Sequence, residues 1–139
     1  MNAVATGATD LCLFAYLVPV GMQLYITNAW ITAMNTGAAV ALTATVLEWA
    51  LGLNSSGVSL TTVDSPGNTW APRRVPMGVH SFPTAAAIGA VQPDIVRAFA
   101  TPLVVESGRY LHVLFKPVIG TVTASQTITG VVGFSGYFE

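Results

Sequence analysis

The most regular alternation of apolar and polar side chains lies in Ile128 to Phe138. One set of alternate positions is apolar and holds Ile128, Val132, Phe134 and Phe138, whereas the positions between them hold Thr129, Ser135 and Tyr137, continuing the parity of Thr127. A period of two places successive side chains on opposite faces of an extended chain. The pattern therefore predicts a β-strand with one buried face.

Two more strands are predicted just before this one. Leu103 to Val105 is apolar and ends at Glu106-Ser107-Gly108, where Gly and Ser favour a tight turn. The next segment, Tyr110 to Phe115, is rich in the β-branched, aromatic and aliphatic residues that strands favour. Because Pro117 has no backbone N–H to donate, we expect strand pairing to stop there.

The segment Met22 to Asn35 has apolar residues at both parities. One predicted face holds Leu24, Ile26, Trp30 and Met34, and the other holds Tyr25, Ile31 and Ala33. A sheet with one face in water would have mainly polar residues on that face. We therefore expect this strand either to lie in the middle of a packed structure or to have one face covered by a neighbouring molecule.

The remaining segments complete an all-β prediction. Further short strands are predicted at Phe14 to Val20, Val58 to Val63, Met77 to Phe82 and Ile95 to Ala100. Ala38 to Leu53 has enough Ala and Leu for a helix, but its β-branched residues and its missing N-cap favour a strand. Asp64 to Pro76 is predicted to be a long loop, because it is irregular and rich in Pro and Gly.

Short strands separated by turn signals predict an antiparallel β-sandwich or barrel, and we favour a jelly-roll-like sandwich. A chain of 139 residues suits one hydrophobic core, so residues 13–139 are predicted to form a single domain. Residues 1–12 are predicted to form an extended N-terminal arm, because Met1 to Asp10 is small and polar without periodicity.

The charge content sets this chain apart from ordinary soluble domains. Charged residues make up 8% of the sequence, against roughly 25% in soluble globular domains. Mixed surface charge normally keeps a free monomer soluble. A chain with so little charge is suited to an assembly in which other protein molecules cover its apolar surface.

Charge and cysteine content also exclude several classes of function. The net charge is -1 and Lys116 is the only lysine, so the chain lacks the basic patch that binds nucleic acid. The apolar stretch Leu11 to Met22 is shorter than the about 20 residues that cross a membrane, and Pro19 interrupts it. Cys12 is the only cysteine, so we expect a small buried hydrophobe. We predict neither a nucleic-acid partner nor a membrane partner.

Candidate catalytic groups are few. His112 is expected within a strand, where a histidine is more often packed and hydrogen-bonded than catalytic. His80 precedes Ser81, but an adjacent hydroxyl is a weak signal for nucleophilic catalysis. The two histidines could meet Asp94 or Glu106 in space, but no metal-ligand spacing supports such a site. We predict no enzymatic activity and no cofactor.

Aromatic and arginine side chains are the candidates for a binding surface. Trp and Arg dominate the energetics of protein interfaces, which favours the arginine pair near Trp70 in the long loop. The full set of predicted interface residues is Trp70, Arg73, Arg74, Trp49, Tyr137 and Phe138. Exposed aromatic rings could instead stack on sugars, although most are expected in the core or on a sheet face.

Three segments carry a resemblance to a known class of proteins. They are Ala39 to Ser55 (AVALTATVLEWALGLNS), Ala71 to Phe82 (APRRVPMGVHSF) and, above all, Glu106 to Glu139. In residue pattern and in their order along the chain, these segments resemble the small all-β virion proteins of tailed bacteriophages. The resemblance is greatest to the decoration or cement proteins, which sit on the capsid as trimers with jelly-roll-like folds.

The resemblance implies a structural virion protein on the capsid surface. Its expected partners are copies of itself, with a homotrimer favoured, and the major capsid protein that it stabilises. Fibre-head domains share the same residue pattern, so a carbohydrate-binding or receptor-binding module remains the alternative. We expect Trp70→Ala or Arg73→Ala to weaken assembly and to leave the fold intact.

Overall fold

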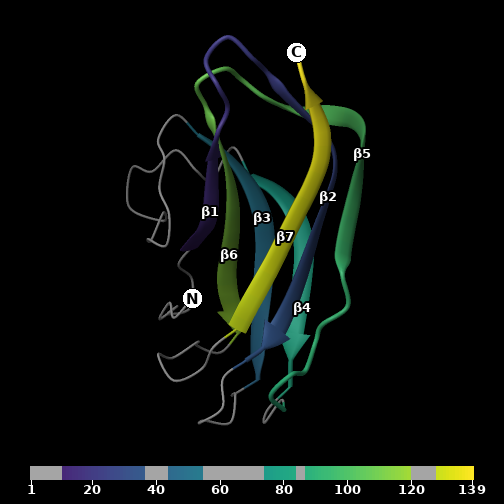
Figure 1. Cartoon of the computed structure of the whole chain (residues 1–139). Coiled ribbons are helices and arrows are strands. Elements are labelled where there is room, and N and C mark those ends of the chain that lie inside the picture. Colours follow the sequence, from purple (N-terminus) through teal and green to yellow (C-terminus); the bar gives the residue numbers. More distant parts are fainter. Residues whose placement is uncertain (1–10, 37–43, 55–73, 84–86, 120–127) are drawn as a thin grey trace.

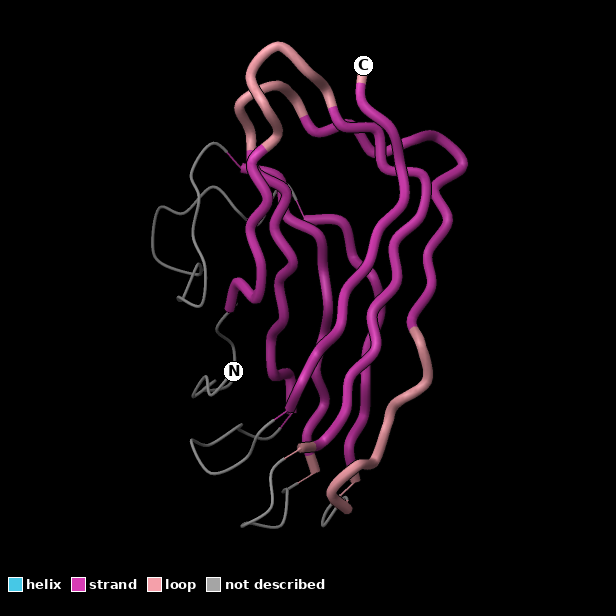
Figure 2. The backbone as a smooth tube through the Cα atoms, viewed as in Figure 1, coloured by secondary structure: helices cyan, strands magenta, loops and turns pink. Residues whose placement is uncertain are grey.

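The computed structural model describes residues 11–36, 44–54, 74–83, 87–119 and 128–139. Within these ranges the chain forms β-strands joined by turns and short extended connections, and none of the described residues is helical (Figure 2). The prediction of an all-β fold is confirmed.

The described strands form two antiparallel sheets that pack face to face (Figure 1). The strands are β1 (Leu11–Leu17), β2 (Leu24–Asn35), β3 (Thr45–Asn54), β4 (Arg74–Phe82), β5 (Ile95–Val105), β6 (Tyr110–Ile119) and β7 (Ile128–Phe138). One sheet has the order β1-β6-β3-β4, and the other has the order β5-β2-β7. Two sheets packed in this way form a β-sandwich. Each described strand lies in the other sheet from the strand before it, except that β3 and β4 lie in the same sheet. The jelly-roll form of the sandwich stays a prediction.

The boundaries of the predicted elements agree with these strands in part. Thr45 to Asn54 is a strand, so the helical alternative is wrong for that stretch. β1 begins at Leu11, which places Leu11 and Cys12 of the predicted arm in the sandwich. The rest of the predicted arm, the predicted strand at 58–63 and most of the predicted loop lie outside the described residues.

The set of alternate residues that faces the core changes partway along β2. Its buried residues are Leu24, Ile26, Ala29, Ile31, Ala33 and Asn35, so the buried positions are even up to 26 and odd from 29. The registers with β5 and with β7 both shift between Ile26 and Asn28, which leaves Thr27 without a register partner. Against β7, Thr27 is the extra residue of a β-bulge, because Ile26 and Asn28 pair with the adjacent residues Gly136 and Ser135.

The bulge corrects the predicted faces of β2. A strict period of two would have placed Trp30 and Met34 on the same face as Leu24. One extra residue reverses that assignment for the second half of the strand. Trp30 therefore lies on the outer face of the sheet, where it is 37% exposed.

Pro117 does not end strand pairing. β6 continues to Ile119, and Pro117 is the register partner of Leu47 in β3. β1 pairs with β6 only as far as Phe115, so Pro117 lies where β6 has one neighbouring described strand. The β3 register is also irregular at this point. Proline is tolerated at such places because fewer ladder hydrogen bonds depend on its missing N–H.

The core lies between the inner faces of the two sheets. Its largest fully buried side chains are Trp49, Phe82, Ile26, Ile31, Leu47, Leu51 and Leu111. Burying an aliphatic or aromatic side chain of this size contributes about 1.5–3 kcal/mol. The two-sheet core is therefore the main source of stability.

One end of the sandwich is held by hydrogen bonds between two turns. The Val18 amide donates to the Arg109 carbonyl over 2.9 Å, and the Gly108 amide donates to the Val18 carbonyl over 3.1 Å. The predicted turn at 106–108 is present, with Gly108 at a φ of 68°, a conformation that glycine adopts at little cost. These bonds join the connection after β1 to the turn between β5 and β6.

Candidate interaction surface

The four edge strands of the two sheets differ in composition. Among the described strands, β1 and β4 are the edges of one sheet, and β5 and β7 are the edges of the other. Edge strands usually carry charges or prolines that prevent pairing with another molecule. β4 contains Arg74 and Pro76, and β5 contains Arg97 and Pro102, whereas β1 and β7 contain no charged residue and no proline. We therefore call β1 and β7 the unprotected edges, meaning the edges without charge or proline among the described strands.

The two protected edges close one side of the sandwich. The Arg97 guanidinium in β5 donates a hydrogen bond to the Pro76 carbonyl in β4. From the same strand β4, His80 Nε2 donates to the Pro93 carbonyl over 2.9 Å. Side chains and backbone therefore link the two sheets along this side.

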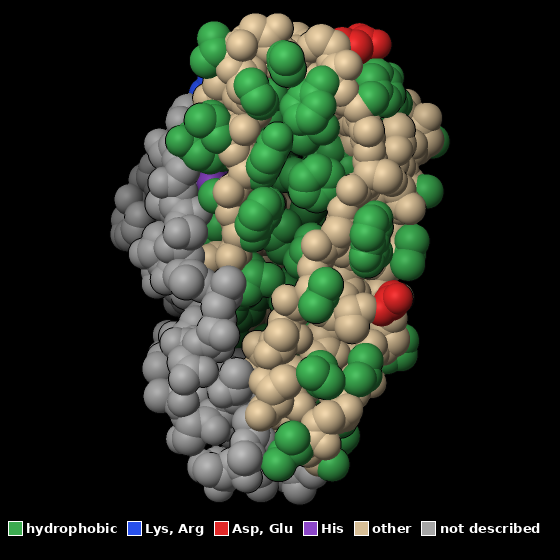
Figure 3. Space-filling view, viewed as in Figure 1, with side chains coloured by type: hydrophobic (Ala, Val, Ile, Leu, Met, Phe, Trp, Pro, Cys, Tyr) green, Lys and Arg blue, Asp and Glu red, His purple; other side chains and the backbone are tan. Residues whose placement is uncertain are grey.

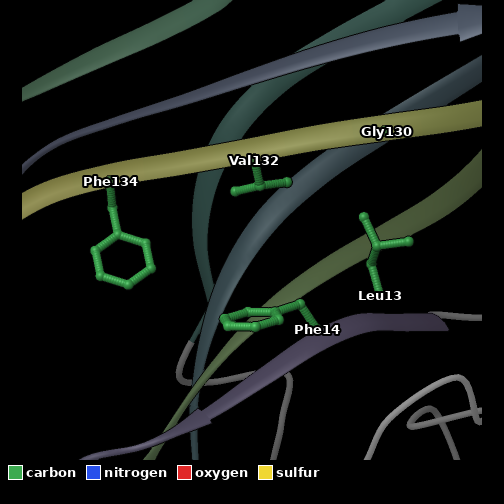
Figure 4. A pocket seen from close by; sticks show the side chains of 5 residues that line it. All are labelled: Leu13, Phe14, Gly130, Val132 and Phe134. Carbon is green, nitrogen blue, oxygen red and sulfur yellow. The ribbon is translucent and has the colours of Figure 1, made fainter.

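The unprotected edges flank an apolar slot on the opposite side. The slot lies between β1 and β7 and is lined by Leu13, Phe14, Gly130, Val132 and Phe134, with a volume of about 220 Å³. Figure 4 shows Leu13 and Phe14 reaching from β1 toward β7, and Val132 and Phe134 reaching from β7 toward β1. We call this feature the β1–β7 slot.

Local irregularity in β1 directs two adjacent side chains to the slot. Its register with β6 shifts between Cys12 and Phe14, which leaves Leu13 without a partner. A bulge of this kind interrupts the alternation of side chains between faces. Hydrophobic side chains gather on this face of the molecule, and the surface is hollowed between β1 and β7 (Figure 3). A groove of this composition favours contact with another apolar surface.

The glycines of β7 allow close approach of its neighbours. A Cβ on Gly133 would lie 2.0 Å from an atom of the Trp30 ring, so this ring lies directly over Gly133. A Cβ on Gly136 would lie 2.0 Å from the backbone carbonyl oxygen of Tyr25, just before the bulge in β2. Gly136 therefore permits the bulged part of β2 to pack against β7.

The outer face of the β5-β2-β7 sheet carries aromatic and aliphatic groups. Tyr25 and Tyr137 stack with ring centroids 5.1 Å apart and planes 2° from parallel. Beside Trp30, Val96 is 63% exposed and Val131 is 59% exposed. The sequence of β2 predicted a second apolar face because apolar residues lie at both sets of alternate positions, and this outer face agrees with that prediction.

The predicted interface residues fall in different parts of the molecule. Trp49 is 2% exposed and packs in the core against His80 and Phe115, so its ring does not reach the surface. Tyr137 and Phe138 are each 45% exposed at the end of β7. Trp70 and Arg73 lie outside the described residues, and Arg74 is the first residue of β4.

The two histidines and the cysteine singled out from the sequence are buried, whereas Asp94 and Glu106 are exposed. Burial lowers the pKa of His112 to about 4. Burial also lowers the pKa of His80, although its hydrogen bond to the Pro93 carbonyl and the nearby Asp94 act in the opposite direction. Cys12 is fully buried, as predicted, and burial raises the pKa of its thiol to about 11 against the effect of its bond to the Phe14 carbonyl.

No group of three or more His, Cys, Asp or Glu side chains within the described ranges is arranged to hold a metal ion. No helix long and apolar enough to span a membrane occurs in the described part of the chain.

Sequence reasoning missed the residues of the β1–β7 slot. Leu13, Val132 and Phe134 look like ordinary strand residues, and only the pairing of the strands shows that β1 and β7 are edges. The signal that could have identified them is the absence of charge and proline from both segments.

Comparisons with known proteins add no relative. No protein-family model matches the chain, and neither the curated proteins nor the solved structures yield a match.

Proposed function

We propose that this protein is a structural component of a larger assembly and acts by binding copies of itself and another protein. The observation that carries the proposal is the unprotected side of the sandwich, where two uncharged edge strands flank the apolar β1–β7 slot. A domain that functions alone in water usually protects such edges. The 8% charged content supports the same function, because few charges oppose association.

The assembly that we propose is the head of a tailed bacteriophage. The protein would be a decoration (cement) protein that lies on the capsid surface and stabilises the major capsid protein beneath it. Support for this part of the proposal comes from the resemblance carried by Ala39 to Ser55, Ala71 to Phe82 and Glu106 to Glu139. The same resemblance implies a homotrimer. A net charge of -1 suits a role without nucleic-acid contact.

Self-association is tested by light scattering coupled to size-exclusion chromatography over a wide range of protein concentrations. We expect a mass that is a multiple of the 14.5 kDa chain. A folded monomer at every concentration would contradict the proposal. Placement on the capsid is tested by electron microscopy of native particles labelled with an antibody to this protein. Label over the head is the expected result.

The alternative is a carbohydrate-binding or receptor-binding module of a fibre head. It is favoured by the outer face of the β5-β2-β7 sheet, where Trp30 lies over Gly133 and Tyr25 stacks on Tyr137. Aromatic rings on a sheet face are suited to packing against sugar rings. A glycan screen distinguishes the two functions, since binding that is lost in Trp30→Ala would favour the module. Antibody label at fibre tips would favour it as well.

A further inference from the structure

β7 is the most exposed of the unprotected edges. Among the described strands it pairs only with β2, so its other edge has no described partner. The strand is 11 residues long, and Val131, Tyr137 and Phe138 are each at least 45% exposed. An exposed, uncharged edge strand of this length is a template for pairing with another strand.

The sequence of β7 is nearly symmetric about Gly133. Glycines lie three residues before and three residues after it, at Gly130 and Gly136. Apolar residues lie one residue to either side, Val132 and Phe134, and others lie at the two ends of the strand. A strand with this symmetry meets equivalent residues when it pairs with a second copy about a two-fold axis.

Antiparallel pairing centred on Gly133 gives a specific register. On the inner face, Val132 of one copy lies opposite Phe134 of the other, so both slots are extended by apolar side chains. On the outer face, Val131 lies opposite Ser135. No charged residue is brought opposite another, because β7 has none. This neutrality fits a second copy of the same strand.

The position of Trp30 agrees with this register. Its ring lies over Gly133, the residue that would sit on the two-fold axis. The two Trp30 rings of a pair would therefore flank the axis on the outer face of the joined sheet. Tryptophan near the centre of an interface is a frequent source of binding energy.

We propose that β7 is a two-fold interface through which two copies of this chain join their β5-β2-β7 sheets into one continuous sheet. The inference rests on the self-association in the proposed function and names the surface that mediates it. A two-fold contact joins copies in pairs. In a trimeric assembly it would therefore link one trimer to the next.

Charge substitutions at Val131 and Ser135 test this register. Both side chains are exposed on the outer face, so substitution leaves the core unchanged. Val131→Lys with Ser135→Lys places like charges directly opposite each other at two symmetry-related positions, which disfavours cross-strand pairing. Val131→Lys with Ser135→Glu places opposite charges there. The matched control is Val96→Lys with Ala98→Lys, which adds the same charge to the outer face of β5.

The assay is sedimentation equilibrium, with circular dichroism to verify the β-structure of each variant. We expect the dissociation constant of the Lys/Lys variant to be about tenfold higher than that of the natural protein, or more. The dissociation constants of the Lys/Glu variant and of the β5 control should stay close to that of the natural protein. Unchanged association of the Lys/Lys variant would overturn the β7 interface but leave self-association standing. Equal weakening of all three variants would also overturn it. A natural protein that is monomeric at every concentration would overturn both proposals.

Discussion

Acidification should destabilise this fold through His112. This histidine is 0% exposed, and its register partners are Ala15 in β1 and Gly52 in β3. Its ring stacks on Tyr110 with planes 3° from parallel. Burial lowers its pKa from the usual value of 6.5 to about 4, because the charged imidazolium loses its hydration at this buried position.

The sign and size of the effect follow from the difference in pKa. The unfolded chain takes up a proton as the pH falls through 6.5, whereas the folded chain resists until about pH 4. Protonation therefore favours the unfolded state over this range. The contribution to the free energy of unfolding is fully present above pH 6.5, and about 2 kcal/mol of it is lost at pH 5. The full loss below pH 4 is about 3 kcal/mol.

Urea denaturation at pH 7 and pH 5 measures this loss. The comparison variant is His112→Leu, which is similar in volume and does not titrate. Between pH 7 and pH 5, the free energy of unfolding of the natural protein should fall by about 2 kcal/mol more than that of His112→Leu. His80→Gln keeps a hydrogen-bond donor. This substitution should change the pH dependence of the free energy of unfolding less than His112→Leu does, because the Pro93 carbonyl and Asp94 oppose the lowering of the His80 pKa. Equal pH dependence in the natural protein and His112→Leu would refute the reasoning.

Three further predictions concern packing and reactivity. Gly136→Ala should lower the free energy of unfolding by about 2 kcal/mol or more, since its Cβ would meet the Tyr25 backbone, and unaltered thermal unfolding would contradict this. Ile31→Ala should cost about 2–5 kcal/mol in chemical denaturation, whereas Val20→Ala, at a site 88% exposed, should change stability by about 0.5 kcal/mol or less. Cys12 should react with a thiol reagent at pH 8 far more slowly in the folded than in the unfolded protein, because its thiol is buried with a pKa of about 11; equal rates would count against its burial.

The local pattern of the sequence was sufficient for much of the fold. The alternation in Ile128 to Phe138 predicted β7, and the packing of Ile128, Val132 and Phe134 against the core agrees with the predicted inner face. Phe138 shares that parity but is 45% exposed, because it lies at the end of the strand. Glycine and serine at 106–108 likewise predicted the turn before β6. These features depend on neighbours along the chain.

Features that depend on strand pairing could not be predicted in this way. The faces of β2 after Ile26 are set by an extra residue that is recognised only from the register with β7. Pro117 lies within a strand at a place where, among the described strands, β6 pairs only with β3. The candidate interaction surface depends on which strands become edges, and that is a property of the whole topology.

The bulge at Thr27 has a consequence for insertions and deletions in β2. The two halves of this strand are out of phase, and Thr27 is the spacer between them. Removing that residue would leave Leu24, Ile26, Ala29, Ile31 and Ala33 at strictly alternate positions, so the same side chains would face inward along the whole strand. The strand should thus tolerate the loss of this one small polar residue without exposing its core side chains, and hydrophobic-dye binding no greater than that of the natural protein would report this.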